Sequence, residues 1–472
     1  MAEQVRVCRV CGQVNPDDDR TRCNKCWASL AGASTVTEIE GERHTRRLQF
    51  TFLRNRVFRI VFLVAAAVGF TVWGVLVFFE LGANPSSPTT SLNASVGPQT
   101  WAQARRTPQN TGYTPDQAPI PQRVMWTYTA SESIVASPTV VDNRIYFTTD
   151  NGDVLALDLH TGQEVWKYIS KLPSSSTPAV VGDMVIFSVR PSRVIALDKE
   201  TGVLRWQSEN FRTSFLASPI VVDGTVYIGG EDNKIYALDA ATGRKRWDFT
   251  TEEWIIAPVA YADDTLAVTS MDGVIHILDT TTGRKRFVFD SSSPITGSPV
   301  IHGDQVYFGT HRGIVWALDR WSITYPFERA IWRWKVQLYV WDMIMDEAPL
   351  QEGTVWGTYI GGKVVKSPAI AHDNVYVAND EGKVTALDAA TGRSLWSTVL
   401  DENITTAPVV AGGTVLVGTE NGVVRGIDAH TGELLWDFRV DGSITDSPII
   451  AGGSMYLVTN AGTIYAVTGE GT

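Results

Sequence analysis

The sequence predicts an all-β protein, an eight-bladed β-propeller with four-stranded blades, and three observations point to it. First, the segment LDAATGRSLW at residues 387–396 has six further copies, and the aspartates of the seven copies are separated by 40, 41, 40, 40, 69 and 40 residues. Second, each copy follows short β-branched runs bounded by Gly, Asn or Asp, which are typical of strands. Third, pairs such as Asn421-Gly422 supply the positive φ that tight hairpins need. A period of this size indicates units that bury their apolar faces on their neighbours.

The number of blades follows from pairs of a small residue and a proline that precede each repeat. Eight such pairs occur, at Ser137-Pro138, Thr177-Pro178, Ser218-Pro219, Ala257-Pro258, Ser298-Pro299, Ser367-Pro368, Ala407-Pro408 and Ser447-Pro448. The last repeat lacks its tryptophan strand, whereas a spare one around Trp126 precedes the first repeat. We therefore expect this N-terminal strand to complete the last blade and close the ring, which removes open sheet edges.

The repeated pattern x-A-L-D-x-x-T-G-x-x-x-W resembles the PQQ-like β-propeller repeat family. That family includes quinoprotein alcohol dehydrogenases and the propeller lipoprotein of the bacterial barrel-assembly machinery. The opening WAQARRTPQNTGY at residues 101–113 is similar to the lead-in of such domains, and the likeness covers roughly residues 101–472. It implies that each Trp packs against the neighbouring blade. Phe287, which replaces the Trp once, should loosen one such contact.

Residues 1–30 contain all four cysteines of the chain, as two C-x-x-C hooks formed by Cys8, Cys11, Cys23 and Cys26. Four thiolates arranged in this way can converge tetrahedrally on one Zn²⁺. The segment resembles small zinc-ribbon heads, although its 11-residue spacer is short. So short a segment cannot bury a core of its own, so we expect structural zinc rather than two disulfides.

Residues 60–79 form an uncharged apolar run long enough to cross a bilayer, which predicts a transmembrane helix at residues 60–81. A basic juxtamembrane segment (residues 31–59) precedes it, and a Ser/Thr/Pro-rich flexible linker (residues 82–100) follows. Residues 1–59 carry a formal charge of +4, which leaves −15 for the rest of the chain. By the positive-inside bias, we expect a single-pass cell-membrane protein with a cytoplasmic N-terminus and an extracytoplasmic propeller, residues 101–472.

The 69-residue step hides an insertion, which the sequence allows to be placed in two ways. By spacing, Trp356 lies 12 residues before Pro368, as Trp396 lies before Pro408. By local pattern, residues 332–336 match residues 436–440, and this favoured placement locates the insertion near residues 337–365, in a loop between two blades. The insertion is apolar enough to need a cover. It is either a plug for the propeller's own channel or a partner-binding surface that includes Trp341, Met343, Ile344, Met345, Trp356 and Tyr359.

Three functions are compatible with these features. We favour a membrane-anchored, non-enzymatic scaffold that binds envelope or membrane proteins through its loop face. An extracytoplasmic ligand sensor with the zinc head inside is the alternative. A PQQ-dependent oxidoreductase is disfavoured because residues 27–472 contain no cysteine for the disulfide that the family resemblance implies at the cofactor. Nucleic acid is excluded as a partner by the acidic balance of the propeller, and no pattern identifies a small-molecule substrate.

Overall fold

The structure, a computed structural model, describes residues 4–8, 14–16, 21–24, 27–37, 64–69, 86–94, 97, 99–191, 193–325, 327–341 and 349–469. The chain divides into two compact units, Met1–Gly82 and Ala83–Thr472.

The first unit contains a three-stranded antiparallel sheet in the order β2-β1-β3. Its strands are β1 (Gln4–Val7), β2 (Val14–Pro16) and β3 (Ser34–Thr37). Cys8, Cys23 and Leu30 are buried together beside it in a small core. The strands β1 and β2 and this core belong to residues 1–30, for which the sequence predicts a zinc ribbon, whereas β3 lies in the predicted basic juxtamembrane segment, residues 31–59.

The single-pass membrane localisation predicted from the sequence requires correction. Within the residues that the structure describes, no helix is long and apolar enough to cross a membrane. Of the predicted span at residues 60–81, residues 64–69 are described and helical, and the others lie outside the described residues.

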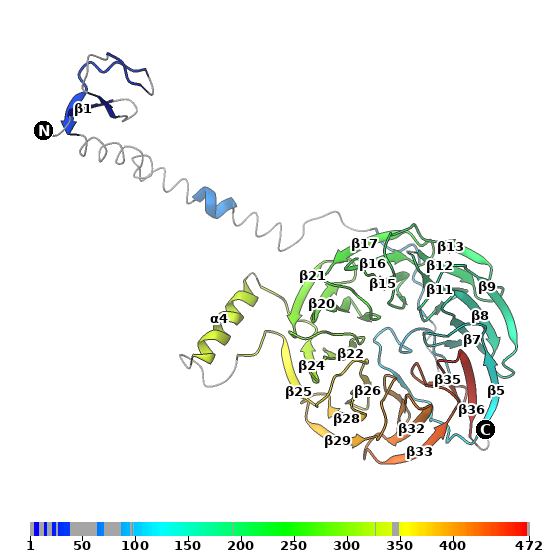
Figure 1. Cartoon of the computed structure of the whole chain (residues 1–472). Coiled ribbons are helices and arrows are strands. Elements are labelled where there is room, and N and C mark those ends of the chain that lie inside the picture. Colours follow the sequence, from blue (N-terminus) through cyan, green and yellow to red (C-terminus); the bar gives the residue numbers. More distant parts are fainter. Residues whose placement is uncertain are drawn as a thin grey trace. The chain divides into compact units, whose positions relative to one another are not determined.

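The described part of the second unit forms eight sheets arranged in a ring (Figure 1). In all but the last, which an N-terminal strand completes, four consecutive strands follow one another from the centre outward. The first four sheets contain β6 (Thr139–Val141), β7 (Arg144–Thr148), β8 (Asp153–Asp158) and β9 (Glu164–Ile169); β10 (Ala179–Val181), β11 (Met184–Val189), β12 (Arg193–Asp198) and β13 (Leu204–Gln207); β14 (Ile220–Val222), β15 (Thr225–Gly229), β16 (Lys234–Asp239) and β17 (Lys245–Thr250); β18 (Ala260–Ala262), β19 (Thr265–Thr269), β20 (Val274–Asp279) and β21 (Lys285–Asp290).

The other four sheets follow the same order. They contain β22 (Val300–His302), β23 (Gln305–Gly309), β24 (Ile314–Asp319) and β25 (Thr354–Tyr359); β26 (Ala369–Ala371), β27 (Asn374–Ala378), β28 (Lys383–Asp388) and β29 (Ser394–Val399); β30 (Val409–Ala411), β31 (Thr414–Gly418), β32 (Val423–Asp428) and β33 (Leu434–Arg439); β34 (Ile449–Ala451), β35 (Ser454–Val458) and β36 (Thr463–Thr468). The last sheet is completed by the N-terminal β5 (Arg123–Thr129), which pairs antiparallel with β36. The predicted closure by the strand of Trp126 is thus confirmed.

Burial changes from the inner to the outer strands and explains their sequences. Inner strands such as β31 are buried along almost their whole length, whereas outermost strands such as β25 alternate between buried and exposed residues. An inner strand packs against other sheets on both faces, so its sequence is a continuous apolar run. An outer strand has one face exposed to solvent, so its sequence alternates between apolar and polar residues.

The Asp-x-x-Thr-Gly turn connects the third and fourth strands of a sheet and is stabilised by hydrogen bonds between its own residues. In the turn at Asp388, the Oδ1 atom accepts hydrogen bonds from the Thr391 amide at 2.8 Å and from its hydroxyl at 2.6 Å. These bonds hold the pKa of Asp388 below its usual value. Gly392 follows with a φ of 69°, which favours glycine because a Cβ would be strained there.

The same turn receives the tryptophan of the preceding sheet. Trp356 packs under Gly392 and donates its indole N–H to the carbonyl of Ala389 at 2.8 Å. In the same way, Trp396 packs under Gly432 and donates its indole N–H to the carbonyl of Ala429 at 3.0 Å. Docking of a Trp on the next blade, which the family resemblance implied, is therefore one of the contacts that link neighbouring sheets.

Phe287 keeps this packing but loses the hydrogen bond. It is fully buried, and its ring lies under Gly353, which replaces the glycine of the turn in the next sheet. A phenyl ring has no N–H to donate, so the expected weakening reduces to one missing hydrogen bond.

Residues 101–114, here called the channel segment, line the inner ends of the sheets. Main-chain amides of seven consecutive innermost strands donate to this segment in turn, from Val140, Val180, Val221, Tyr261, Ile301, Ile370 and Val410. It ends in β4 (Tyr113–Thr114), which pairs parallel with β30. Figure 1 shows it as a light-blue trace inside the ring. Among the described residues, the N-terminal lead-in therefore lies inside the channel, and the described part of the insertion does not.

Part of the segment predicted to be a flexible linker makes defined contacts with the propeller. The carbonyl of Ser86 accepts a hydrogen bond from Arg246 at 2.8 Å. The amide and hydroxyl of Thr89 both bind Asp239 at 2.7 Å, and the amide of Gly224 donates to Leu92. Residues 86–94 therefore lie along the rim near β14–β17, because their polar groups complement those of a turn.

The insertion lies elsewhere than the favoured placement, which is wrong. The outermost strand of its sheet is β25 with Trp356, paired with β24, as the spacing alternative required. Residues 332–336 belong instead to the helix α4 (Glu328–Val340), whose sequence has no glycine or proline and is rich in good helix formers. Residues 321–353 thus form the insertion, between the third and fourth strands of one sheet.

This position sets the side of the propeller from which the insertion projects. In a sheet of antiparallel strands, the third strand ends at the edge opposite to the one where the first strand begins. The insertion follows the end of β24, so it leaves the propeller at the edge opposite to the loops that join one sheet to the next. Figure 1 shows α4 outside the ring.

Candidate functional site

A cavity of about 410 Å³ occupies the centre of the ring, at the edge where the innermost strands begin. Its wall comes from the residues that precede these strands in all eight repeats, including Ser137, Thr177, Ser218, Ala257, Ser298, Ser367, Ala407 and Ser447. Ala104 and Arg105 of the channel segment also line it. The proline that follows each small residue cannot donate a ladder hydrogen bond, which suits it to the start of a strand.

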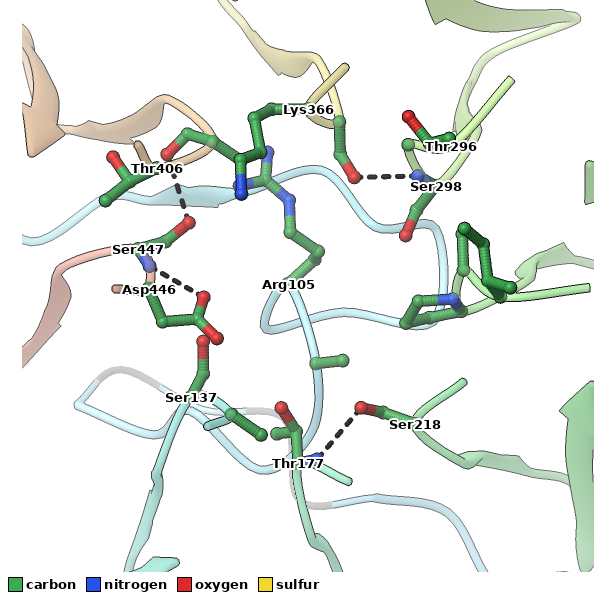
Figure 2. A pocket seen from close by; sticks show the side chains of 18 of the residues that line it. Arg105, Ser137, Thr177, Ser218, Thr296, Ser298, Lys366, Thr406, Asp446 and Ser447 are labelled. Carbon is green, nitrogen blue, oxygen red and sulfur yellow. Dashed lines mark hydrogen bonds between the residues drawn. The ribbon is translucent and has the colours of Figure 1, made fainter. Parts of the chain in front are cut away.

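Three charged side chains enter this cavity from one sector of the ring. Figure 2 shows Arg105, Lys366 and Asp446 directed toward its centre. Lys366 and Asp446 lie two residues before the prolines of the sixth and eighth repeats. The equivalent positions of the other repeats hold uncharged residues, namely Ala136, Ser176, Ala217, Ile256, Gly297 and Thr406. Alignment of the repeats at the proline would have found both charges, a signal that our sequence analysis missed.

Arg105 is the most buried of the three, with 8% of its surface exposed. Its Nη2 donates to the carbonyl of Pro368 at 2.6 Å and its Nη1 to the carbonyl of Pro408 at 2.9 Å. Burial lowers the pKa of Arg105 to about 10, and the Asp446 carboxylate opposes this shift. The guanidinium is therefore still charged at neutral pH, and two main-chain carbonyls hold it in place.

The insertion carries a second candidate site, an exposed aromatic surface. In the part of the chain that the structure describes, the exposed aromatic side chains are Trp27, Trp254, Trp321, Tyr325, Phe327, Trp334, Trp341 and Tyr359. All but the first two lie on the insertion or on β25, which follows it. Ile331, Val340 and Leu350 add exposed aliphatic side chains to the same segment. We call the exposed residues from Trp321 to Tyr359 the insertion surface.

Helix α4 presents two different faces. Trp332 is half-buried and donates its indole N–H to the carbonyl of Pro349 at 2.9 Å, so this side of the helix packs on its own segment. Ile331 and Trp334 are 50% and 63% exposed, and Trp341, which caps the C-terminus of the helix, is 60% exposed, whereas Leu338 on the same stripe is buried. Apolar residues at this spacing form one stripe of a helix, which normally packs on another element.

The six residues predicted to bind a partner have different positions in the structure. Trp341 and Tyr359 are exposed, so they stay candidates. Trp356 is 8% exposed because it docks on the next blade, so a role as a surface anchor is corrected to a structural one. Met343, Ile344 and Met345 lie outside the described residues.

The predicted metal site is described in part. The structure brings Cys8 and Cys23 together in one buried core, where the Asn15 side-chain N–H lies 3.7 Å from the Cys23 Sγ atom. Cys11 and Cys26 lie outside the described residues, and the described residues alone contain no cluster of three or more metal-binding side chains. Two buried thiols with an amide N–H directed at one sulfur fit one half of a tetrahedral thiolate site.

The ring of sheets, the Asp-x-x-Thr-Gly turns and the docked tryptophans define a PQQ-like repeat propeller. Residues 64–217, 190–322 and 334–471 match the family described as outer membrane protein assembly factor BamB, so the chain belongs to this family. A comparison with curated proteins gives no match.

Solved structures support the fold at low sequence identity. BamB from Moraxella catarrhalis is 18% identical with a TM-score of 0.59, over 73% of this chain and 99% of that one. Quinohemoprotein alcohol dehydrogenase from Comamonas testosteroni is 16% identical with a TM-score of 0.63, over 79% and 81%. The computationally designed protein Ika8 is 16% identical with a TM-score of 0.61, over 74% and 100%. Identities this low establish the likeness of fold alone.

Proposed function

We propose that this chain is a non-enzymatic, eight-bladed propeller scaffold that binds a protein of the cell envelope through the insertion surface. The observation that carries the proposal is the concentration of exposed aromatic residues between Trp321 and Tyr359. Contiguous exposed apolar surface is disfavoured in water, and aromatic residues dominate the energetic centres of protein interfaces. Membership of a family described as an outer membrane protein assembly factor supports a partner of this class.

The chemistry of the channel supports the non-enzymatic part of the proposal. A quinone cofactor with Ca²⁺ would need several oxygen ligands, as calcium binds six to eight. Among the described residues that line the cavity, Asp446 is the one carboxylate, and the rest are hydroxyl, apolar and basic side chains. This donor set does not fit a calcium site.

For the N-terminal unit, we infer a structural zinc ion held by Cys8, Cys11, Cys23 and Cys26. The shared burial of Cys8 and Cys23 supports it. Zinc would supply stability to a unit with few buried apolar residues, and no reaction step is assigned to it.

A capture experiment with the full chain tests the scaffold function. Wild-type protein and the Trp334→Ala/Trp341→Ala variant would be used as baits for envelope fractions, with cross-linking and identification of the captured proteins. We expect a saturable partner that the double variant loses, since truncating aromatic anchors costs about 2 kcal/mol or more each. Trp254→Ala is the matched control, because Trp254 is also exposed but lies away from the insertion. Equal capture by all three proteins would refute the assignment.

A further inference from the structure

The channel cavity combines features that a protein-binding scaffold does not require. Lys366 and Asp446 occupy the same position in two of the eight repeats. The other six repeats have a small, apolar or hydroxyl residue there. Both charged residues and Arg105 lie in the sector formed by the sixth to eighth repeats. The charges therefore depart from the repeat at one place rather than being scattered around the channel.

Arg105 keeps unused hydrogen-bond donors inside the protein. A guanidinium has five N–H donors, and two of them serve the carbonyls of Pro368 and Pro408. Its Nε atom is buried and has no partner among the described residues. The hydroxyl of Ser175, which also lines the cavity, is likewise buried without a partner in the described structure. Buried polar atoms are normally paired, so these two leave hydrogen-bonding capacity unused in the residues that line the cavity.

The sign of the local charge is opposite to that of the surrounding domain. Arg105 and Lys366 against Asp446 give a net charge of +1 in the cavity, whereas residues 60–472 carry −15. A cationic pocket in an acidic domain concentrates anions locally while the rest of the surface repels them. Two cations with a carboxylate nearby match a molecule that carries both an anionic and a cationic group.

We propose that this cavity is a binding site for a small organic carboxylate that also carries an ammonium group, such as an amino acid. The ligand carboxylate binds Arg105 and Lys366, and its ammonium faces Asp446. The ring of serine and threonine hydroxyls supplies further donors and acceptors at the wall. A volume of about 410 Å³ accommodates such a molecule. This site is separate from the insertion surface, which lies at the other edge of the sheets.

Titration calorimetry of the full chain with L-glutamate as the probe tests the site, with succinate as the comparison that lacks the ammonium group. We expect saturable binding with one site per chain, and weaker binding of succinate. Lys366→Met should weaken both ligands about 10- to 100-fold, because it removes a charged hydrogen bond. Asp446→Asn should weaken glutamate and leave succinate unchanged or tighter. Lys363→Met is the matched control, since Lys363 is exposed on the same segment but does not line the cavity.

Lys366 and Asp446 are substituted in place of Arg105, because Arg105 binds the main-chain carbonyls of Pro368 and Pro408 and its loss would disturb the fold. Asn at position 446 keeps the oxygen that accepts a hydrogen bond from the Ser447 amide at 2.7 Å. Absence of saturable glutamate and succinate binding at millimolar concentration would overturn the proposal. So would equal affinities in wild type and Lys366→Met, or inorganic phosphate binding as tightly as glutamate, which would indicate a site for any anion.

Discussion

Replacing Gly432 by alanine tests the contact that links neighbouring blades. Gly432 has a φ of +78°, and a Cβ built there would lie 2.7 Å from two atoms of the Trp396 ring. The left-handed backbone costs a non-glycine residue about 1–2 kcal/mol. Overpacking against a ring that two sheets hold in place adds about 1–3 kcal/mol. We therefore expect a loss of about 2–5 kcal/mol in the free energy of unfolding.

Two other glycines separate these contributions. Gly303 has a φ of +56° with nothing within 4 Å of its Cβ position, so Gly303→Ala should cost only the backbone term, about 1–2 kcal/mol. Gly413 has open space and no positive φ, so Gly413→Ala should change stability by less than about 0.5 kcal/mol. Urea unfolding followed by tryptophan fluorescence measures all three. A loss of stability in Gly432→Ala no larger than that in Gly303→Ala would refute a steric contribution from the Trp396 ring.

Three further predictions concern the tryptophans, the acidic turns and the N-terminal unit. Trp356→Ala should cost about 3–5 kcal/mol in urea unfolding as a buried ring is lost, whereas Trp341→Ala at an exposed position should change it by less than about 0.5 kcal/mol; comparable losses would contradict the two placements. Hydrogen bonds from Arg205 and Thr201 lower the pKa of Asp198 to about 2. Its ionised form therefore favours the folded state above the unfolded pKa of about 4, and this stability is lost as the pH falls toward 2. The urea midpoint of wild type should exceed that of Asp198→Asn at pH 6, and the difference should be smaller at pH 3; a constant difference would refute the assignment. Purified protein should contain one zinc per chain by metal analysis and lose it in Cys8→Ser/Cys23→Ser; bound iron or disulfides in its place would exclude the zinc site.

The sequence by itself determined the features that repeat locally. Strand runs, turn glycines and docking tryptophans recur about every 40 residues because each blade buries its apolar faces on its two neighbours through the same contacts. The pairing of β5 with β36 was also predictable, since one repeat lacks a strand and another segment has a spare one. The charges of Lys366 and Asp446 were visible in the same alignment, although their meeting place was not.

Only the tertiary structure decided where the non-repeating segments lie. Residues 101–114 contain no strand pattern, yet they fill the channel because seven innermost strands offer unpaired amides to them. Residues 332–336 resemble an outer strand, but β24 pairs with β25 instead, and Trp356 of β25 docks on the turn at Ala389. The position of Arg105 in the cavity also depends on distant contacts, because it binds the carbonyls of Pro368 and Pro408, which are more than 250 residues away in the chain. Contacts between residues so distant in the chain leave no periodic trace, and the closed ring alone brings them together.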